Sequence, residues 1–277
     1  MSDYLILEPL TIEELVAQDS SVEDSFHFHD GVWWRKIRPF FYQPAFFFQP
    51  IEPKSSSPLK QKALIGYHHV VPDTSEPNSY FKMLIHRNVE EYSIDMLSRE
   101  TKKNLKRANK YLNIKEIIDI KDLLNDGYET YVSFRKRTNW GYDKSNYRIF
   151  SQWITKAFAL KKRVFLGVYF NDKLIAYCDP YSVEGMAYIG VIISHSEYLI
   201  YRPNDLMLNT FLAICKNSPD VTTANIGPAS LKPSLDQFKM KYGFEIVKYP
   251  TYIWLNPFVK HLLKKFYIKK YKQLFGL

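Results

Sequence analysis

Three β-rich runs joined by very short turns form the segment that most constrains the fold of this chain. The runs cover residues 163–170, 174–183 and 186–194, and the turns between them are residues 171–173 and 184–185. Parallel neighbours need a connection of about a dozen residues or more, so strands joined this closely lie antiparallel. The sequence therefore predicts a three-stranded antiparallel meander.

Helical and strand patterns flank this meander on both sides. Before it, we expect a basic helix over 98–112, a strand over 113–118 and helices over 121–138 and 145–160. After it, we expect a helix ending at 217, a strand over 222–226, a helix over 234–242 and a strand over 244–254. Near the N-terminus, Thr11 and Glu14 have the spacing of a capping box that opens a helix. This order predicts an α+β protein.

Two local motifs refine this prediction. Residues 97–108 read LSRETKKNLKRA, and residues 235–244 read LDQFKMKYGF. The first is similar to a leucine-serine, basic, asparagine-leucine helix, and the second to a helix end with phenylalanine-lysine ahead of an aromatic-glycine pair. Both are features of the Fem-type (FemABX-like) branch of the GNAT acyltransferase superfamily. The element order over 113–254, about half of the chain, also resembles that superfamily.

The resemblance implies a GNAT-like acyltransferase fold, with a mixed, mostly antiparallel sheet flanked by helices. The acyltransferase domain is expected at residues 96–256. Residues 1–95 would be an N-terminal α/β extension that braces this domain or is a reduced first GNAT-like domain. Residues 257–277 are expected to form one basic amphipathic helix.

The implied activity is transfer of an acyl or aminoacyl group from an activated donor to a substrate amine by direct attack. Acyl-CoA (acetyl-CoA, for example) and aminoacyl-tRNA are the two donors that the resemblance leaves open. The acceptor would be an amine-bearing small molecule, glycan or peptide precursor. A GNAT-like donor site also requires the strand at 186–194 and the next strand to splay into a V-shaped cleft.

The third meander strand is the expected site of bond formation. A backbone N–H of Gly190, Val191 or Ile192 would stabilise the tetrahedral oxyanion, as the resemblance implies. Val191 and Ile193 are the residues of this strand expected to contact the donor.

The phenylalanine-lysine pair of the second motif supplies two further candidates. The resemblance places Lys239 near the transferring group, where its cation would stabilise developing negative charge or bind a terminal tRNA phosphate. Phe238 would contact the donor beside it. The alternative is a solvated lysine on a helix whose other face carries Phe238.

Residues 201–205 occupy the position of the GNAT pyrophosphate loop. Arg202, Asn204 and Asp205 are the donor-binding candidates there, and arginine pairs well with phosphate. The stretch has no glycine to let backbone N–H groups approach a phosphate, and Asp205 would repel one. Both features count against CoA as the donor, and a loop ion pair is the alternative role for Arg202.

Three polar residues of the meander are candidates for proton transfer. Asp179 would act as a base or orient the substrate, but its position before Pro180 equally suits a bulge or kink. Tyr188 would protonate the leaving group, or pack. His195 would be a base, or a structural residue at a strand end.

Charge and composition indicate the partners. The net charge of +9 suggests an anionic partner, and much of it lies in residues 99–110 and in residues 258–277, which contain six lysines and no acidic residue. The first segment would contact phosphates of a tRNA or of a lipid-linked acceptor, unless it is simply the solvated face of its helix. The second would contact an anionic membrane surface, unless it docks on the domain as a closing helix with its lysines in water. A catalytically inactive GNAT-like module that binds RNA or such a surface is therefore the alternative function.

Other features narrow the setting. Acidic residues in the first fifteen positions argue against a signal peptide, and two cysteines make no disulfide framework. We therefore expect a cytoplasmic protein, peripheral at the inner face of the membrane if its C-terminal helix binds there. His27, His29, His68 and His69 have no further ligand at a recognisable spacing, so no metal site is expected. The aromatic run 33–48 is either a packing or a substrate surface.

Overall fold

The computed structural model describes residues 5–22, 25–138, 146–230 and 232–275. The chain divides into two compact units, one of Met1–Leu10 with Leu84–Glu245 and one of Thr11–Met83 with Ile246–Leu277. This division replaces the expected boundaries after residues 95 and 256. Strand β1 (Pro9–Leu10) pairs with β9 (Lys173–Val183), and the end of β12 (Glu245–Leu255) pairs with β5 (Gly66–Val70). Pairing between distant segments therefore decides which residues form each unit.

The first unit contains the predicted meander. Strands β8 (Leu166–Phe170), β9 and β10 (Met186–Ser194) are consecutive antiparallel neighbours. The sheet continues through β7 (Asn113–Glu116) beside β8, and through β11 (Thr223–Pro228) and β6 (Ser79–Arg87) beyond β10. The described strands thus form a mixed, mostly antiparallel sheet, as predicted.

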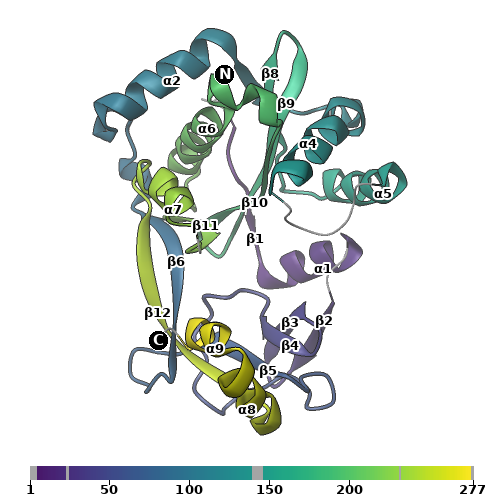
Figure 1. Ribbon diagram of the computed structural model, residues 1–277, viewed down its shortest axis with the longest axis vertical. Helices are drawn as coiled ribbons and strands as arrows, with labels where there is room; N and C mark the ends of the chain where they lie inside the picture. The colour runs from purple at the N-terminus through teal and green to yellow at the C-terminus, as the bar shows by residue number, and fades with distance from the viewer. Residues whose placement is uncertain (1–4, 23–24, 139–145, 231, 276–277) are drawn as a thin grey trace. The chain divides into compact units, whose positions relative to one another are not determined.

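Helices cover both faces of the meander (Figure 1). Helices α4 (Tyr128–Thr138) and α5 (Tyr147–Phe158) lie on one face, where Tyr131 and Phe150 pack against Tyr177. Helices α2 (Arg99–Tyr111) and α6 (Pro203–Asn217) cover the other face with a larger apolar cluster. The unit also contains α3 (Ile120–Asp122), the π-helical turn η4 (Leu123–Gly127), α7 (Pro233–Met240), and the 3₁₀ helices η2 (Val89–Glu91), η3 (Ile94–Met96) and η5 (Ser196–Tyr201).

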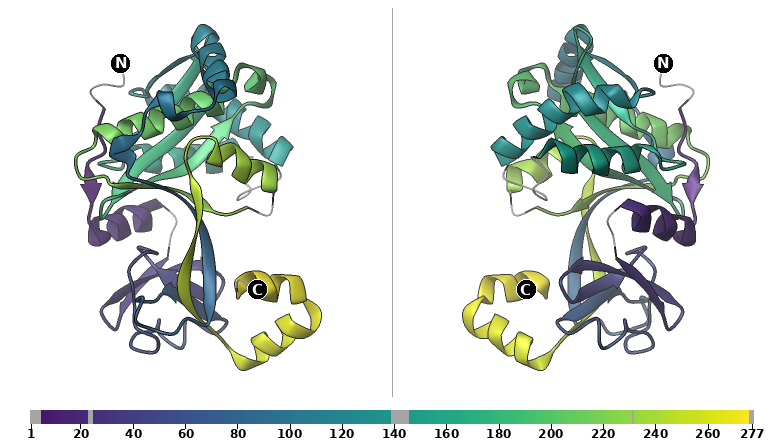
Figure 2. Two further views of the ribbon diagram at one scale, coloured as in Figure 1. Left: turned by 90° about the vertical axis from the view of Figure 1, so that its left-hand side faces the viewer. Right: turned by 90° about the vertical axis from the view of Figure 1, so that its right-hand side faces the viewer.

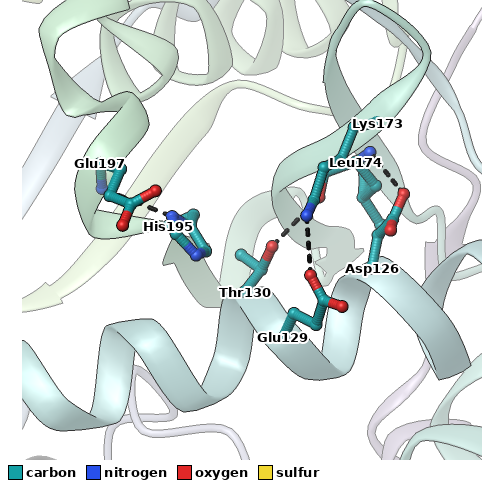
Figure 3. Close-up of polar contacts among 7 residues, drawn as sticks. All are labelled: Asp126, Glu129, Thr130, Lys173, Leu174, His195 and Glu197. Atoms are coloured by element: carbon teal, nitrogen blue, oxygen red, sulfur yellow. Dashed lines mark hydrogen bonds and ion pairs between the residues drawn. The ribbon is translucent and has the colours of Figure 1, made fainter.

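Polar contacts fix the start of α4 to the start of β9 (Figure 3). The hydroxyl of Thr130 donates to the Leu174 carbonyl at 3.1 Å, and the Leu174 N–H donates to Asp126 at 3.0 Å. Lys173 and Glu129 form an exposed ion pair at 2.7 Å. These bonds satisfy backbone groups at the strand end and set the position of α4 on the sheet.

The second unit is built around the aromatic run. Strands β2 (Phe26–His29), β3 (Val32–Arg38) and β4 (Phe41–Pro44) are successive antiparallel neighbours, and β5 lies parallel to β4. Trp34 is fully buried there beside Tyr42 and Tyr67. The run therefore largely packs this unit's interior. Helix α1 (Ile12–Val22) opens with the predicted capping box, since the backbone N–H groups of Thr11 and Glu14 each donate to the other side chain.

The C-terminal segment forms two helices, which corrects the prediction of one (Figure 2). Helix α8 (Pro257–Phe266) ends at Tyr267, whose backbone leaves the helical region at φ −134° and ψ 46°, and α9 (Ile268–Leu274) follows. Burial explains the break, because it lets Tyr271 and Phe275 pack with Phe41. Within the described residues, no helix is long and apolar enough to cross a membrane.

Buried histidines lie in the second unit without forming a metal centre. No group of three or more metal-ligating residues occurs in the part of the chain that the structure describes. His68 is buried, and its Nε2 lies 3.1 Å from the Gln43 side-chain oxygen. Burial, with a smaller contribution from the neighbouring His69, lowers the pKa of His68 to about 4.

This burial predicts a loss of stability in mild acid. The unfolded chain binds a proton at His68 below about pH 6.5, whereas the folded chain binds it only near pH 4. The contribution of His68 is therefore complete above pH 6.5 and decreases as the pH falls toward 4. We expect a His68→Gln variant to lose about 2–3 kcal/mol less unfolding free energy than wild type between pH 7.5 and 4.5, measured by urea denaturation. Equal pH slopes for the two proteins would refute this assignment.

Candidate functional site

The candidate site lies where β10 separates from β11. The two strands pair in parallel over Met186–Thr223, Ala187–Ala224 and Tyr188–Asn225. Beyond Tyr188, β10 continues to Ser194 beside β9, whereas β11 continues to Pro228 without a recorded β10 partner. Both strands can be followed in Figure 1. This divergence is the splayed arrangement that a GNAT-like donor site requires.

A β-bulge coincides with the divergence. Ile189 lies opposite Pro180 and Ile192 opposite Cys178, so Gly190 and Val191 both face the single residue Asp179. A bulge of this kind bends its strand and redirects the local backbone. The extra residue therefore accounts for β10 turning away from β11 at this point.

The buried carboxylate of Asp179 holds the bulge. Its Oδ1 accepts the Val191 backbone N–H at 2.5 Å. A Cβ added to Gly190 would lie 2.6 Å from the other carboxylate oxygen, so only glycine leaves room for this contact. Val191, one of the three expected oxyanion donors, therefore already donates to a side chain of the same chain.

The bulge separates two kinds of environment along β10. Ile193 is buried with Tyr177 under α4 and α5, so its side chain is not available to a donor, in contrast to the expectation. Ile192 packs on the opposite face with the α6 cluster. Tyr188 is half-buried and stacks on Tyr181 of β9 with ring centroids 5.3 Å apart. Tyr188 therefore borders the site at the last paired position.

Lys239 forms a hydrogen bond to β11, the strand on the other side of the divergence. Helix α7 projects its half-buried side chain to β11, where Nζ donates to the Ile226 carbonyl at 2.8 Å. Ile226 is the first residue of β11 after the last recorded β10–β11 pair. Burial lowers the pKa of Lys239, and nearby Asp236 opposes that shift. The Lys239 side chain is thus fixed against the part of β11 that does not pair with β10.

The start of α6 differs from a phosphate-binding loop. Arg202 is exposed and adopts a left-handed backbone conformation at φ 68°, and Pro203 is the first helical residue. Asn204 accepts a hydrogen bond from the Ser194 hydroxyl at 2.5 Å. The arrangement leaves Arg202 as the exposed member of the three donor-binding candidates.

Asp205 is buried at this helix start and accepts a hydrogen bond from the Tyr242 hydroxyl at 2.8 Å. Burial raises the pKa of Asp205, whereas the Tyr242 bond and Arg202 lower it. Phe238 packs edge-on against Tyr242 at 5.8 Å. Because a carboxylate already occupies the positive end of α6, an anionic ligand has less to gain there. The sequence motif contains Tyr242 but gives no sign of this long-range bond.

His195 has a structural role. Its Nδ1 accepts the Glu197 backbone N–H at 3.4 Å and so caps the 3₁₀ helix η5 (Figure 3). This contact fits the structural role at a strand end that the sequence suggested as the alternative to a base.

A cavity of the first unit lies away from the bulge. It has a volume of about 670 Å³ and is lined mainly by α2, β7 and α6, with Asn109, Asn113, Asn209 and Thr210 among its polar residues. Gly190, Val191 and Lys239 do not line it. The Asn209 side chain accepts a hydrogen bond from Tyr92 at 2.9 Å, so part of its capacity is already used.

Comparison with solved structures identifies the fold. No sequence-family model and no curated protein sequence matches the chain. FemX superposes with a TM-score of 0.57 at 9% identity, covering 96% of each chain. The C-terminal domain (DUF2156) of a candidate lysylphosphatidylglycerol synthetase from Agrobacterium fabrum gives 0.56 at 10% identity, covering 97% of this chain and 93% of the other. L-PGS from Bacillus licheniformis gives 0.53 at 12% identity, covering 95% and 96%. The chain therefore has a GNAT-like fold of the Fem type.

The bulge predicts strong coupling between Gly190 and Asp179. We expect Gly190→Ala to lower the unfolding free energy by about 1–3 kcal/mol, because the new methyl group overlaps the carboxylate. Asp179→Ala in the same chain should remove most of that penalty. Urea denaturation of the two single variants and the double variant measures the coupling. Additive effects, within about 0.5 kcal/mol, would show that the two residues do not compete for this space.

Proposed function

We propose that the chain transfers an acyl or aminoacyl group from an activated donor to a substrate amine. The separation of β10 from β11 at the Asp179-bound bulge carries this proposal, because it creates unpaired backbone beside a fixed lysine. The fold adds support, since one structure of similar fold is the C-terminal domain of a candidate lysylphosphatidylglycerol synthetase, whose name describes an aminoacyl transfer. The acceptor would carry its amine on a small molecule, glycan or peptide precursor.

Direct attack requires few groups. The amine nitrogen forms a C–N bond with the donor carbonyl carbon, and the bond from that carbon to the leaving group breaks, C–O in an aminoacyl ester or C–S in an acyl thioester. One proton moves from the amine to the departing oxygen or sulfur, and Asp179 is the carboxylate at the bulge that can carry it. Tyr188, at the last paired position, is the candidate for positioning the departing oxygen.

Lys239 would stabilise the oxyanion electrostatically. Its ammonium is partly desolvated and already oriented by the Ile226 carbonyl, so it needs little reorganisation during the reaction. The backbone N–H groups of Gly190 and Ile192 are the other candidate donors, since Asp179 accepts the N–H of Val191.

The donor that we propose is aminoacyl-tRNA. At the start of α6, buried Asp205 takes the place where a CoA pyrophosphate would bind. Helix α2 offers five exposed cations that form no ion pair with a described residue: Arg99, Lys103, Lys106, Arg107 and Lys110. At the end of this helix, the half-exposed Tyr111 contacts Tyr201, next to exposed Arg202. Cations beside exposed rings suit a polynucleotide end better than a single pyrophosphate.

Replacement of Lys239 tests this function. We expect Lys239→Met to lower the single-turnover rate of transfer by about 10²–10³-fold, because one preorganised charge is lost at the oxyanion. The assay follows a labelled aminoacyl group from aminoacyl-tRNA, or a labelled acetyl group from acetyl-CoA, to an amine library. Lys241→Met is the matched control, because Lys241 is exposed on the same segment and pairs with Glu100 at 3.2 Å. It should leave the rate nearly unchanged.

The outcomes separate the alternatives. Transfer from acetyl-CoA alone would reject the tRNA donor and retain the reaction class. No transfer from either donor, or equal rates for wild type and Lys239→Met, would favour the inactive binding module instead.

A further inference from the structure

The C-terminal helices of the second unit expose large apolar side chains among lysines. Phe258 is 70% exposed, Phe266 62%, Tyr267 56% and Ile268 49%. Six lysines lie on the same segment: Lys260, Lys264, Lys265, Lys269, Lys270 and Lys272. None of them forms an ion pair with a described residue, and residues 246–277 contain no acidic residue and no arginine. Exposed aromatic residues of this size need an explanation.

The unit's own core covers only one apolar stripe of α8. Leu263 packs toward the cluster of Phe41, Ile253 and Leu255. Phe258 and Phe266 are spaced eight residues apart and therefore lie on a second stripe, which the described residues leave exposed. Helix α8 thus has a wider apolar surface than folding of this unit uses.

Neighbouring loops extend this surface. The Phe40 carbonyl accepts the Ile65 N–H at 3.0 Å, and the Ile65 carbonyl accepts the N–H of Asn256, the residue before α8, at 2.9 Å. Phe40 is 49% exposed and Leu64, the residue before Ile65, is 51% exposed. Two exposed apolar residues on loops thus lie beside the start of the helix. We call α8, α9 and these two loop residues the C-terminal patch.

Lysine side chains of the patch lie beside its exposed aromatic rings. Lys265 lies over the Phe266 ring at 5.3 Å and Lys270 over the Tyr267 ring at 5.4 Å. Long lysine stems can cover aromatic surface while the ammonium group remains in a polar layer. Rings at the level of the headgroups with lysines beside them are the arrangement of a helix lying in a lipid interface.

We propose that the C-terminal patch docks on the surface of an anionic lipid bilayer. Phe258, Phe266 and Ile268 would enter the acyl-chain boundary, and the lysines would contact the negative headgroups. The aliphatic and phenyl groups favour this partner over a nucleic acid, and so does the lack of arginine, which is the better residue for bidentate phosphate recognition. This docking goes beyond the proposed transfer reaction and does not depend on it.

Vesicle co-sedimentation of the full chain tests the proposal. We expect wild type to bind phosphatidylcholine vesicles containing about 30 mol% phosphatidylglycerol at least about tenfold more tightly than pure phosphatidylcholine vesicles. The double variant Phe258→Ser/Phe266→Ser should lose at least about tenfold in binding to the anionic vesicles, because it removes apolar surface without changing charge. Lys264→Gln/Lys265→Gln/Lys269→Gln should weaken the same binding and reduce its salt dependence.

Matched controls make the result specific. Ile118→Ser changes a side chain that is 85% exposed in the first unit, and Lys103→Gln/Lys106→Gln/Arg107→Gln changes a comparable cluster on α2. Both should bind anionic vesicles as wild type does, and circular dichroism should show all variants folded. Three results would overturn the proposal. The first is that wild type does not bind anionic vesicles, and the second is that the Phe258→Ser/Phe266→Ser variant binds them as wild type does. The third is that the protein binds a single-stranded oligonucleotide more tightly than the vesicles and loses this binding only when the patch lysines are replaced. The Phe258→Ser/Phe266→Ser variant should keep the wild-type transfer rate in solution, because neither residue belongs to the proposed transfer site.

Discussion

The hydrogen bond between the Asp179 carboxylate and the Val191 backbone N–H is the interaction on which the site depends. It holds two residues of β10 opposite one residue of β9, and this extra residue turns β10 away from β11. Glycine is the only residue type at position 190 that leaves the Asp179 carboxylate enough space. The divergence of β10 from β11 therefore results from one buried carboxylate and one missing side chain, whereas the helices on either face only support it.

Buried polar contacts also define what the site can bind. The Tyr242 hydroxyl and Asp205 close the positive end of α6, while Lys239 bonds to the Ile226 carbonyl on the unpaired part of β11. Lys239 is thus held on β11 beyond the last pair with β10, and a carboxylate occupies the N-terminal end of α6, where the resemblance places a pyrophosphate. This distribution favours a donor held through an extended nucleic acid over a donor held through its pyrophosphate.

Local sequence patterns predicted the meander, the flanking helices and the motif that contains Lys239, because each depends on neighbouring residues. They failed where distant segments decide the outcome. The pairing of β12 with β5 and of β1 with β9 changed the unit boundaries, and burial of Tyr271 broke the expected C-terminal helix in two. For the site, the sequence suggested a bulge or kink at Asp179 as one of two roles, and the structure has a bulge there. The oxyanion role of the third meander strand stays a prediction. The contacts of Asp179 with Val191 and of Asp205 with Tyr242 depend on tertiary packing, and no local pattern predicts such pairs.

In the proposed reaction, the donor carbonyl binds where β10 leaves β11. Backbone amide chemical shifts of the labelled protein, recorded during titration with a non-hydrolysable amide-linked 3′-aminoacyl oligonucleotide, test it most directly. The structure predicts that the largest shifts occur at residues 189–193 and 226–227, on the two sides of the divergence. Shifts confined to the residues that line the large cavity beside α2 and α6, or no shifts at saturating ligand, would contradict it.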